Sequence, residues 1–333
     1  MRPLRLTGPD LRPADIAGRV LTHDLGPDLR KGAVLNAGHL DRLRSAGEIH
    51  VVELEPGDVH EDVASIRLAQ ALLGDHLEAT APHQSQVRIR ATARGLVRVD
   101  PGAVEACNQL PGIAVFTVYD DQAVNAGDDV AGCKVTPVAI AESVLAQAEA
   151  LCRARPVIRL LPFRALRTLL VVTERLKPKA REIFQAAVSR KLGWYGAEVV
   201  DTLEVARSRE AVAEAYASAR KAKADLILFA GASSIDPLDP AYSELSAEGG
   251  ELIRFGMPAH PGSMLWLGRL SGKPVVGIAS CAGFGKQTSL DLVLPVVFAY
   301  GDIDSRGLAR LGYGGLIEES AGRRFPPYND LAT

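Results

Sequence analysis

The sequence has 333 residues, of which 47% are hydrophobic and 23% are charged. That much apolar material is enough for a sizeable core, and the length is typical of two or three domains. The net charge of -2 lacks the excess of Lys and Arg with which nucleic-acid-binding proteins neutralise phosphates. Duplex DNA or RNA is therefore not an expected partner.

The cysteines and the apolar runs indicate a cytoplasmic protein. Cys107, Cys133, Cys152 and Cys281 form no CxxC pair, which argues against a zinc knuckle and against a disulfide framework. Reduced thiols are therefore expected. Residues 1–10 contain no apolar run of signal-peptide length, and the longest apolar stretches are far shorter than the roughly 20 residues that cross a bilayer. No membrane partner is predicted.

The first segment, residues 1–76, has the pattern of a small α+β unit. Residues 19–22 predict a short strand, residues 39–46 a helix that ends at Gly47, and residues 49–54 a second strand. An amphipathic helix is expected over residues 62–73, with Gly74 as its stop.

The second segment, residues 77–152, has short alternating strands at close intervals. Strands are predicted over residues 87–91, 95–100, 113–118 and 133–135, with turn signals such as Pro111-Gly112 between them. The alanine-rich residues 138–152 predict a helical linker to the next domain. This segment is therefore expected to be a β-rich unit followed by a helix.

Residues 153–302 predict an α/β domain in which strands and helices alternate. Strands are expected over residues 168–173, 197–200, 224–231 and 274–279, and helices over residues 178–193, 208–223 and 289–298. Continuous apolar runs such as residues 168–173 are typical of strands buried on both faces of a parallel sheet. The expected fold is a three-layer, doubly wound sheet that binds ligands at the carboxyl ends of its strands. Residues 303–333 form a C-terminal tail whose role the sequence does not indicate.

The loop after the third of these strands, residues 230–240, is a candidate phosphate site. Its small residues let backbone N–H groups approach a ligand closely, and its hydroxyls can bond phosphate oxygens. The residues concerned are Gly231, Ala232, Ser233 and Ser234. Asp236 and Asp239 could hold a hard cation on that phosphate. A tight β-to-α turn, with an Asp capping the next helix, is the alternative explanation.

Two further loops lie near strand ends. The first contains His260, Pro261, Gly262 and Ser263, and the second contains Ser280, Cys281 and Lys286. His260 can bond a phosphate, or it can be a histidine hydrogen-bonded in a turn. Cys281 can face the ligand or pack in the core, and Lys286 can bind an anion or be a solvated charge. The second loop lacks the Gly-Lys-Ser/Thr order of a nucleotide P-loop, which disfavours a Walker-type ATPase.

The stretch from Arg167 to Ala299 resembles the molybdopterin-binding domain shared by MogA, MoaB, MoeA and gephyrin. MoeA proteins carry a Gly-Gly-x-Ser-x-Gly-Asp-x-Asp pattern after the third strand, then a Lys-Pro-Gly-Lys-Pro loop and a Leu-Pro-Gly-Asn-Pro loop. Residues 231–239, 260–264 and 278–282 stand at these places in the same order and spacing. Residues 257–270 and 280–282 are more similar still to the molybdopterin-binding domains fused to nucleotidyltransferases.

This resemblance implies a ligand of the molybdopterin type, free or adenylylated, whose phosphate lies in the three loops. It implies that Mg²⁺ and molybdate take part, and that the protein is a homo-oligomer. It gives catalytic roles to Asp239 and Glu174, and it makes Asp239 and Asp236 metal ligands.

Several side chains depart from the MoeA pattern. The Thr-Gly-Asp-Glu-Leu element after the first strand is replaced by residues 173–176, in which Glu174 is the one acid. His260 and Ser263 replace the two lysines of the Lys-Pro-Gly-Lys-Pro loop. Three basic residues could supply the lost charge, namely Lys286, Lys273 and Arg175.

Two functions follow from this comparison. The first is an enzyme of molybdenum-cofactor biosynthesis with MoeA-like molybdotransferase activity, whose chemistry needs a divalent cation and positioned phosphates. The second is a non-catalytic carrier or chaperone that holds the cofactor for a client molybdoenzyme. The substituted acids and lysines favour the carrier, whereas the retained Ser234 and Asp239 favour the enzyme.

Overall fold

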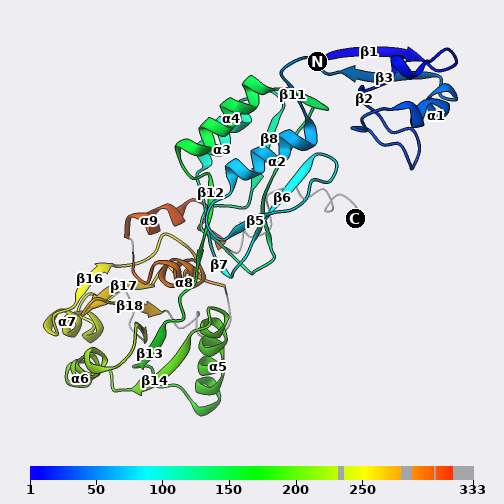
Figure 1. Ribbon diagram of the computed structural model, residues 1–333. Coiled ribbons are helices and arrows are strands. Elements are labelled where there is room, and N and C mark those ends of the chain that lie inside the picture. The colour runs from blue at the N-terminus through cyan, green and yellow to red at the C-terminus, as the bar shows by residue number, and fades with distance from the viewer. Residues whose placement is uncertain (232–235, 279–286, 304, 318–333) are drawn as a thin grey trace, which may run out of the picture. The chain divides into compact units, whose positions relative to one another are not determined.

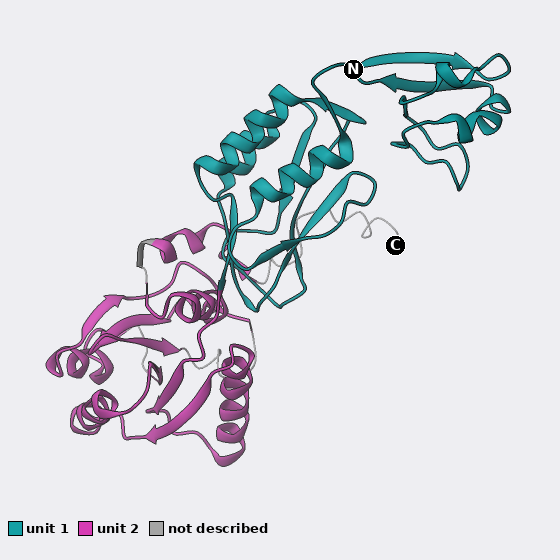
Figure 2. Cartoon of the chain, in the orientation of Figure 1, with its two compact units in different colours: residues 1–161 teal, residues 162–333 magenta. Residues whose placement is uncertain are grey.

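The structure of the protein is a computed structural model that describes residues 1–231, 236–278, 287–303 and 305–317 (Figure 1). The chain forms two compact units, Met1–Leu161 and Pro162–Thr333, coloured teal and magenta in Figure 2. Each unit has buried apolar clusters of its own. Among the described residues, no helix combines the length and apolar character needed to span a membrane.

Unit 1 begins with a three-stranded antiparallel sheet in the order β1-β3-β2. Its strands are β1 (Arg2–Thr7), β2 (Val20–Leu21) and β3 (Glu48–Glu53). Helix α1 (Leu40–Arg44) packs on this sheet through Leu43, which shares a buried cluster with Ile49 of β3. The helix predicted over residues 39–46 is confirmed. It is shorter than predicted because Asn36 caps a preceding 3-10 turn, Ala37–His39.

A four-stranded sheet, a second three-stranded sheet and a two-stranded ladder complete the strands of unit 1 (Figure 1). One sheet, in the order β5-β6-β10-β8, contains β5 (Leu77–Ala79), β6 (Gln86–Ala91), β10 (Asp129–Val135) and β8 (Ile113–Thr117). The other, β12-β7-β9, contains β12 (Ile158–Pro162), β7 (Gly95–Val99) and β9 (Gln122–Val124). The ladder pairs β11 (Ala139–Ala141) with β4 (Asp58–His60). The strands predicted within residues 87–135 are therefore confirmed.

Three helices pack with these sheets: α2 (Glu61–Leu72), α3 (Pro101–Asn108) and α4 (Glu142–Ala154). Helix α2 confirms the prediction over residues 62–73. Helix α3 was not predicted, although Asp100 accepts a hydrogen bond from the Ala103 N–H as its N-cap and Pro101 occupies its first turn. Helix α4 corresponds to the expected linker, but its Leu145 and Ala148 are fully buried in the core of unit 1. Residues before and after the predicted segment boundaries at 76 and 152 thus pack in one core.

Unit 2 contains a six-stranded mixed sheet in the order β14-β13-β15-β18-β17-β16. The strands β13 (Arg167–Val172), β14 (Glu198–Glu204), β15 (Leu226–Ala230) and β18 (Lys273–Ile278) run parallel and confirm the four predicted strands. Strand β17 (Trp266–Leu270) is antiparallel to β18, and β16 (Glu251–Arg254) is antiparallel to β17.

Helices pack against both faces of this sheet because its central strands are apolar on both sides. Leu170 and Val172 of β13 share a buried cluster with the helices α5 (Pro178–Trp194) and α8 (Ser289–Tyr300). The alternate residues Leu169 and Val171 share another with α6 (Arg209–Lys221) and α7 (Pro240–Ala247). Unit 2 is thus an α/β unit, and the short elements α9 (Ser305–Ala309) and η4 (Arg310–Gly312) follow α8.

The sheet topology collects the connecting loops at one edge of unit 2. The parallel strands β13, β14 and β15 end at this edge, so residues 173–177, 205–208, 231 and 236–239 lie along it. Strand β16 runs parallel to β18, which places residues 255–265 at the same edge. Carboxyl edges of this kind are where ligands bind in α/β sheets.

Candidate ligand site at the carboxyl edge of unit 2

A pocket of about 910 Å³ lies at the ends of β13, β14 and β15. Its polar lining comes from the residues after β13 and β14, together with the side chains of Arg181 on α5 and Glu204 at the end of β14. Those residues are Thr173, Glu174, Arg175, Arg207 and Ser208. Gly231, the first residue after β15, also lines the pocket. The pocket has the size of a small-molecule site.

The charged residues of the pocket are three arginines and two glutamates, which favours an anionic ligand. Arg181 pairs with Glu204 at 3.0 Å, but both side chains are about half-exposed, so this pair contributes little to stability. Arg175 is exposed and has no ion pair among the described residues. Its guanidinium is therefore available to an anion in the pocket.

Gly231 brings the end of β15 against the end of β13. Its φ of 112° lies in the region that favours glycine, and a Cβ there would be 2.4 Å from Thr173 Oγ1 and 2.9 Å from the Glu174 backbone nitrogen. The Thr173 N–H and hydroxyl both donate to the Ala230 carbonyl, at 2.9 and 3.2 Å. The absence of a side chain at Gly231 therefore permits the close approach that forms one wall of the pocket.

Asp239 is the buried N-cap residue of α7. Its Oδ1 accepts a hydrogen bond of 2.9 Å from the Ala241 N–H, and its Oδ2 pairs with Arg207. The side chain is only 2% exposed. The alternative explanation, an Asp that caps the next helix, thus describes Asp239 in this structure, and its carboxylate also fixes an arginine of the pocket.

Asp236 makes a local turn before α7. Its Oδ1 accepts from the Leu238 N–H at 2.9 Å, and its carbonyl accepts from the Asp239 N–H at 3.1 Å. Across the described residues, no cluster of three or more His, Cys, Asp or Glu side chains is placed to hold a metal ion. In this arrangement Asp236 and Asp239 do not form a cation site by themselves, so a cation would need oxygens from the ligand. The metal-binding role of these two residues stays a prediction that depends on the bound ligand.

The loop from His260 to Ser263 is fixed by its own backbone bonds. The His260 N–H donates to the Gly315 carbonyl at 2.7 Å, and the His260 carbonyl accepts from Ile317 N–H at 2.8 Å. The His260 side chain is exposed, and the peptide bond to Pro261 is cis. Residues 315–317 thus run beside this loop, a neighbour that the sequence did not reveal.

The same loop packs on the start of α8. The Ser289 N–H donates to the Pro261 carbonyl at 2.9 Å, and the Ser289 hydroxyl donates to the Gly262 carbonyl at 2.5 Å. Gly262 has a φ of 101°, and a Cβ there would be 2.5 Å from Ser289 Oγ. The exposed Ser263 accepts from the Met257 N–H through its carbonyl at 2.9 Å. These backbone groups already have partners within the protein.

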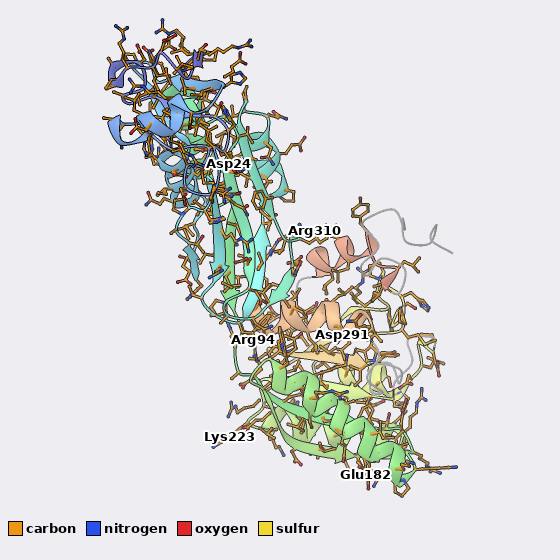
Figure 3. The ribbon with its side chains drawn as sticks, turned by 90° about the vertical axis from the view of Figure 1, so that its right-hand side faces the viewer. Asp24, Arg94, Glu182, Lys223, Asp291 and Arg310 are labelled. Carbon is orange, nitrogen blue, oxygen red and sulfur yellow. The ribbon has the colours of Figure 1, made fainter. Side chains whose placement is uncertain are left out.

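Helix α8 is also capped by protein groups. The Thr288 hydroxyl accepts from Leu290 N–H, and Asp291, which Figure 3 labels, accepts from the Thr288 N–H at 2.8 Å. Asp291 further pairs with Lys191 at 2.5 Å. Because its first backbone donors are used in this way, the start of α8 is less suited to a phosphate than an uncapped helix would be.

The candidate residues of the sequence analysis fall into three groups. Gly231 and Glu174 line the pocket, whereas Asp236, Asp239 and the loop of His260, Pro261, Gly262 and Ser263 do not. Ala232, Ser233, Ser234, Ser280, Cys281 and Lys286 lie outside the described residues. The sequence analysis did not single out Arg181, Arg207 or Ser208. Arg207 and Ser208 stand between a predicted strand and a predicted helix, which places them at the sheet edge but does not show that they face a pocket.

No model of a protein family matches the sequence, and no curated protein matches it. The chain is, however, similar to several solved structures. The molybdopterin biosynthesis MoeA protein from Pyrococcus horikosii is 15% identical over 77% of this chain and 81% of that chain, with a TM-score of 0.32. A putative molybdenum cofactor biosynthesis protein from Corynebacterium diphtheriae is 19% identical over 41% of this chain and 97% of that chain, with a TM-score of 0.29.

A molybdenum cofactor biosynthesis protein B is 13% identical over 45% of this chain and 93% of that chain, with a TM-score of 0.29. MoeA, which the sequence motifs resemble, is thus among the proteins to whose structures this chain is similar.

Proposed function

We propose that this chain binds molybdopterin, or its adenylylated form, as a protein of molybdenum-cofactor biosynthesis. The observation that carries the proposal is a pocket of arginines and hydroxyls at the strand ends of unit 2, which Gly231 and Glu174 of the sequence-based candidates line. The proposal includes a three-layer, doubly wound fold for residues 153–302, a cytoplasmic location and a homo-oligomeric state.

In the proposed complex, the phosphate lies between Arg175, Arg207 and Gly231. Guanidinium groups bind phosphate oxygens in pairs of hydrogen bonds, and Ser208 can add a hydroxyl. The proposal also keeps the sequence-based ligand-binding roles of six residues outside the described part of the chain, namely Ala232, Ser233, Ser234, Ser280, Cys281 and Lys286. The exposed His260 and Ser263 lie along the same edge.

Between the two functions, the contacts of Asp239 favour a carrier over a molybdotransferase. The resemblance gave this residue catalytic and metal-binding roles, but both of its oxygens already bind protein groups. Glu174 and Glu204 are the acids that line the pocket, and the resemblance gives a catalytic role to Glu174. We therefore propose a protein that holds the cofactor for a client molybdoenzyme, with molybdate insertion assisted by Mg²⁺ as the alternative.

The experiment is a titration of the purified full chain with molybdopterin and with adenylyl-molybdopterin, followed by pterin fluorescence. We expect Arg175→Ala to weaken binding about tenfold, which corresponds to about 1.4 kcal/mol for one charge-assisted contact. Arg190→Ala is the matched control because Arg190 is exposed on α5 and lies outside the pocket lining. The proposal is overturned if neither pterin binds, or if Arg175→Ala and Arg190→Ala weaken pterin binding equally.

A second assay separates the carrier from the enzyme. Release of AMP from adenylyl-molybdopterin is measured with molybdate and Mg²⁺ present. Binding without release supports the carrier. Release that is lost in Glu174→Gln, while the variant still binds the pterin, supports the enzyme.

A further inference from the structure

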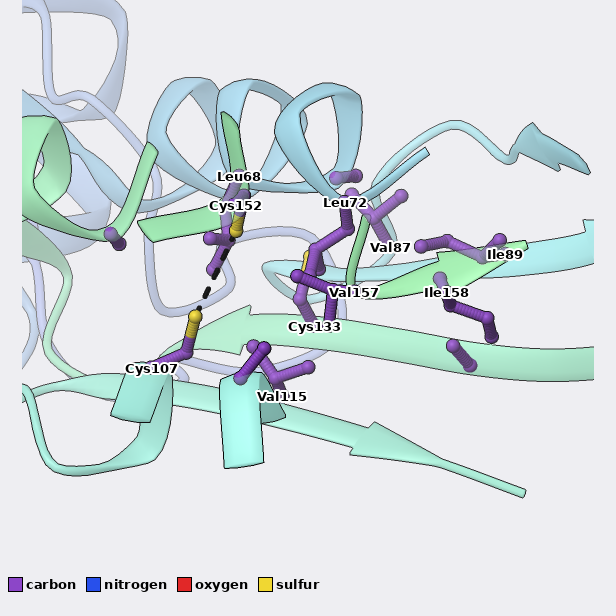
Figure 4. Close-up of a cluster of buried hydrophobic side chains, with 14 of the residues drawn as sticks. Leu68, Leu72, Val87, Ile89, Cys107, Val115, Cys133, Cys152, Val157 and Ile158 are labelled. Atoms are coloured by element: carbon purple, nitrogen blue, oxygen red, sulfur yellow. Dashed lines mark hydrogen bonds between the residues drawn. The ribbon is translucent and has the colours of Figure 1, made fainter. Parts of the chain in front are cut away.

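Two buried cysteines face each other in the core of unit 1. Cys107 on α3 and Cys152 on α4 place their sulfur atoms 3.8 Å apart, a contact that Figure 4 marks with a dashed line. Cys107 is 0% exposed and Cys152 is 4% exposed. Both belong to one packed apolar cluster, so the surrounding side chains hold the two sulfur atoms close to each other.

Cys152 also lines a cavity of about 510 Å³ beside α2 and α4. The exposed residues Arg153, Pro156 and Arg159 line the same cavity, so it opens to the surface of unit 1. Cys152 is therefore the cysteine of the pair that borders a cavity open to small polar molecules. Cys107 then lies directly behind it, at the distance of a sulfur–sulfur contact.

The three cysteines of this core differ in their chemistry. The hydrogen bond from Cys152 lowers the pKa of Cys107 to about 7, because the thiol that keeps its proton donates to the thiolate. Burial raises the pKa of Cys133 to about 12, and its thiol donates to the Ser65 carbonyl at 3.5 Å. Thiolates, not thiols, react with oxidants and disulfides. Cys107 is thus the more reactive thiol, whereas the same hydrogen bond raises the pKa of Cys152, which keeps its proton.

We propose that Cys107 and Cys152 are a redox modification site that closes to a disulfide when the protein meets hydrogen peroxide. A thiolate of the pair attacks one peroxide oxygen, and the O–O bond breaks to give a sulfenic acid and, with a proton, one water molecule. The other sulfur then attacks the sulfenic sulfur, the S–O bond breaks and a second water leaves. The two thiols lose two electrons and two protons, and hydrogen peroxide is reduced to two waters.

The new bond joins helices α3 and α4. The sulfur atoms need to approach from 3.8 Å to about 2.05 Å, a shift that side-chain rotation and a small movement of either helix can provide. The bond closes a loop whose ends are 45 positions apart in the sequence, which restricts the unfolded chain. The oxidised protein is therefore expected to be more resistant to heat, and a dithiol reductant is expected to reverse the change.

The test uses the reduced full chain with Cys281→Ser, a background that removes the one cysteine outside the described residues. After treatment with hydrogen peroxide, free thiols are blocked with N-ethylmaleimide and the digest is read by mass spectrometry. We expect a peptide pair that joins Cys107 to Cys152, one blocked thiol at Cys133, and loss of the pair after reduction.

Cys133→Ser is the matched control because it changes a third cysteine of the same core and is expected to keep the linked pair. Cys152→Ser is expected to abolish it. The proposal is overturned if peroxide leaves Cys107 and Cys152 as free thiols, converts them to sulfinic acids, or links either one to Cys133. The mass-spectrometric assignment on the chain that keeps Cys107, Cys133 and Cys152 tests the proposal even if a serine variant of one of them does not fold.

Discussion

The buried carboxylate of Asp239 at the start of α7 pairs with Arg207, which lies 32 positions earlier in the loop after β14. Asp239 is 2% exposed, whereas the Arg207 side chain is 46% exposed and lines the pocket. The same carboxylate caps α7 through the Ala241 N–H. One acid therefore joins two strand-end loops and fixes an arginine at the proposed site.

Replacement of Asp239 by Asn tests this relationship. The amide oxygen can still accept from Ala241, but the ion pair is lost, so we expect a loss of about 1–2 kcal/mol in unfolding free energy. Asp236→Asn is the control, because Asp236 is exposed and Asn can accept from the Leu238 N–H in the same way. We expect the control to change stability by less than about 0.5 kcal/mol in urea unfolding. Equal losses of unfolding free energy in Asp239→Asn and Asp236→Asn would contradict a stabilising ion pair between Asp239 and Arg207.

The strands of unit 2 could be predicted because their signal is local. Residues 168–173 form an apolar run, and β13 occupies nearly the same residues with five buried positions in succession. Helix α3 was missed because Pro101-Gly102 reads as a turn, although an Asp before a Pro is also a helix start. The linker assigned to residues 138–152 is a core helix because its apolar face meets strands that lie far away in the sequence.

The site could be predicted only in part. Glycine at position 231 marks a close backbone approach, and Gly231 and Glu174 do line the pocket. The partners of Asp239 could not be predicted, because a capping Asp and a catalytic Asp have the same sequence signature. Arg207 follows an edge strand, and no local pattern shows that such a residue turns toward a pocket rather than toward solvent.

Tyr242 gives a second prediction, because its hydroxyl is buried without a hydrogen-bond partner among the described residues. Tyr216 is the matched control, since its hydroxyl donates to the Ala241 carbonyl at 2.7 Å. Burial raises the pKa of both phenols, so both remain protonated donors at neutral pH. We expect Tyr216→Phe to lose about 1 kcal/mol in chemical denaturation and Tyr242→Phe to be neutral or slightly stabilising. If Tyr242→Phe instead loses as much unfolding free energy as Tyr216→Phe, the Tyr242 hydroxyl has a hydrogen-bond partner in solution.

Acid sensitivity is expected from the network of Arg67, Glu142 and Glu149 in unit 1. Arg67 bonds Glu142 at 2.7 Å and Glu149 at 2.9 Å, and these bonds lower the pKa of both carboxyls below the ordinary 4.5. A carboxyl with a lowered folded pKa stabilises the fold above its unfolded pKa, and this stability is lost as the pH falls through the folded value. Unfolding free energy is therefore expected to fall below about pH 4.5.

Glu149→Gln tests this network, since the Glu149 side chain is only 10% exposed and carries the more buried of the two pairs. The variant should be less stable than the wild type at pH 7, and the difference should shrink as the pH falls through the lowered folded pKa of Glu149, because the wild-type carboxyl then becomes protonated. Urea unfolding at a series of pH values measures the stability difference at pH 7 and its change with pH. A difference that does not change with pH would exclude the ion pair as its cause.

Gly231→Ala tests whether the pocket wall depends on the close approach of two strand ends. The new Cβ would meet Thr173 Oγ1 at 2.4 Å and would also sit at a φ of 112°, so two separate costs are expected. Gly196→Ala isolates the second cost, because Gly196 has a φ of 74° with no atom within 4 Å of its Cβ position. We expect a loss of about 1 kcal/mol at Gly196 and at least about 2 kcal/mol at Gly231 in urea unfolding. Pterin titration of the two folded variants should then show weaker binding in Gly231→Ala and unchanged binding in Gly196→Ala. Unchanged binding in Gly231→Ala would mean that the ligand does not contact this wall.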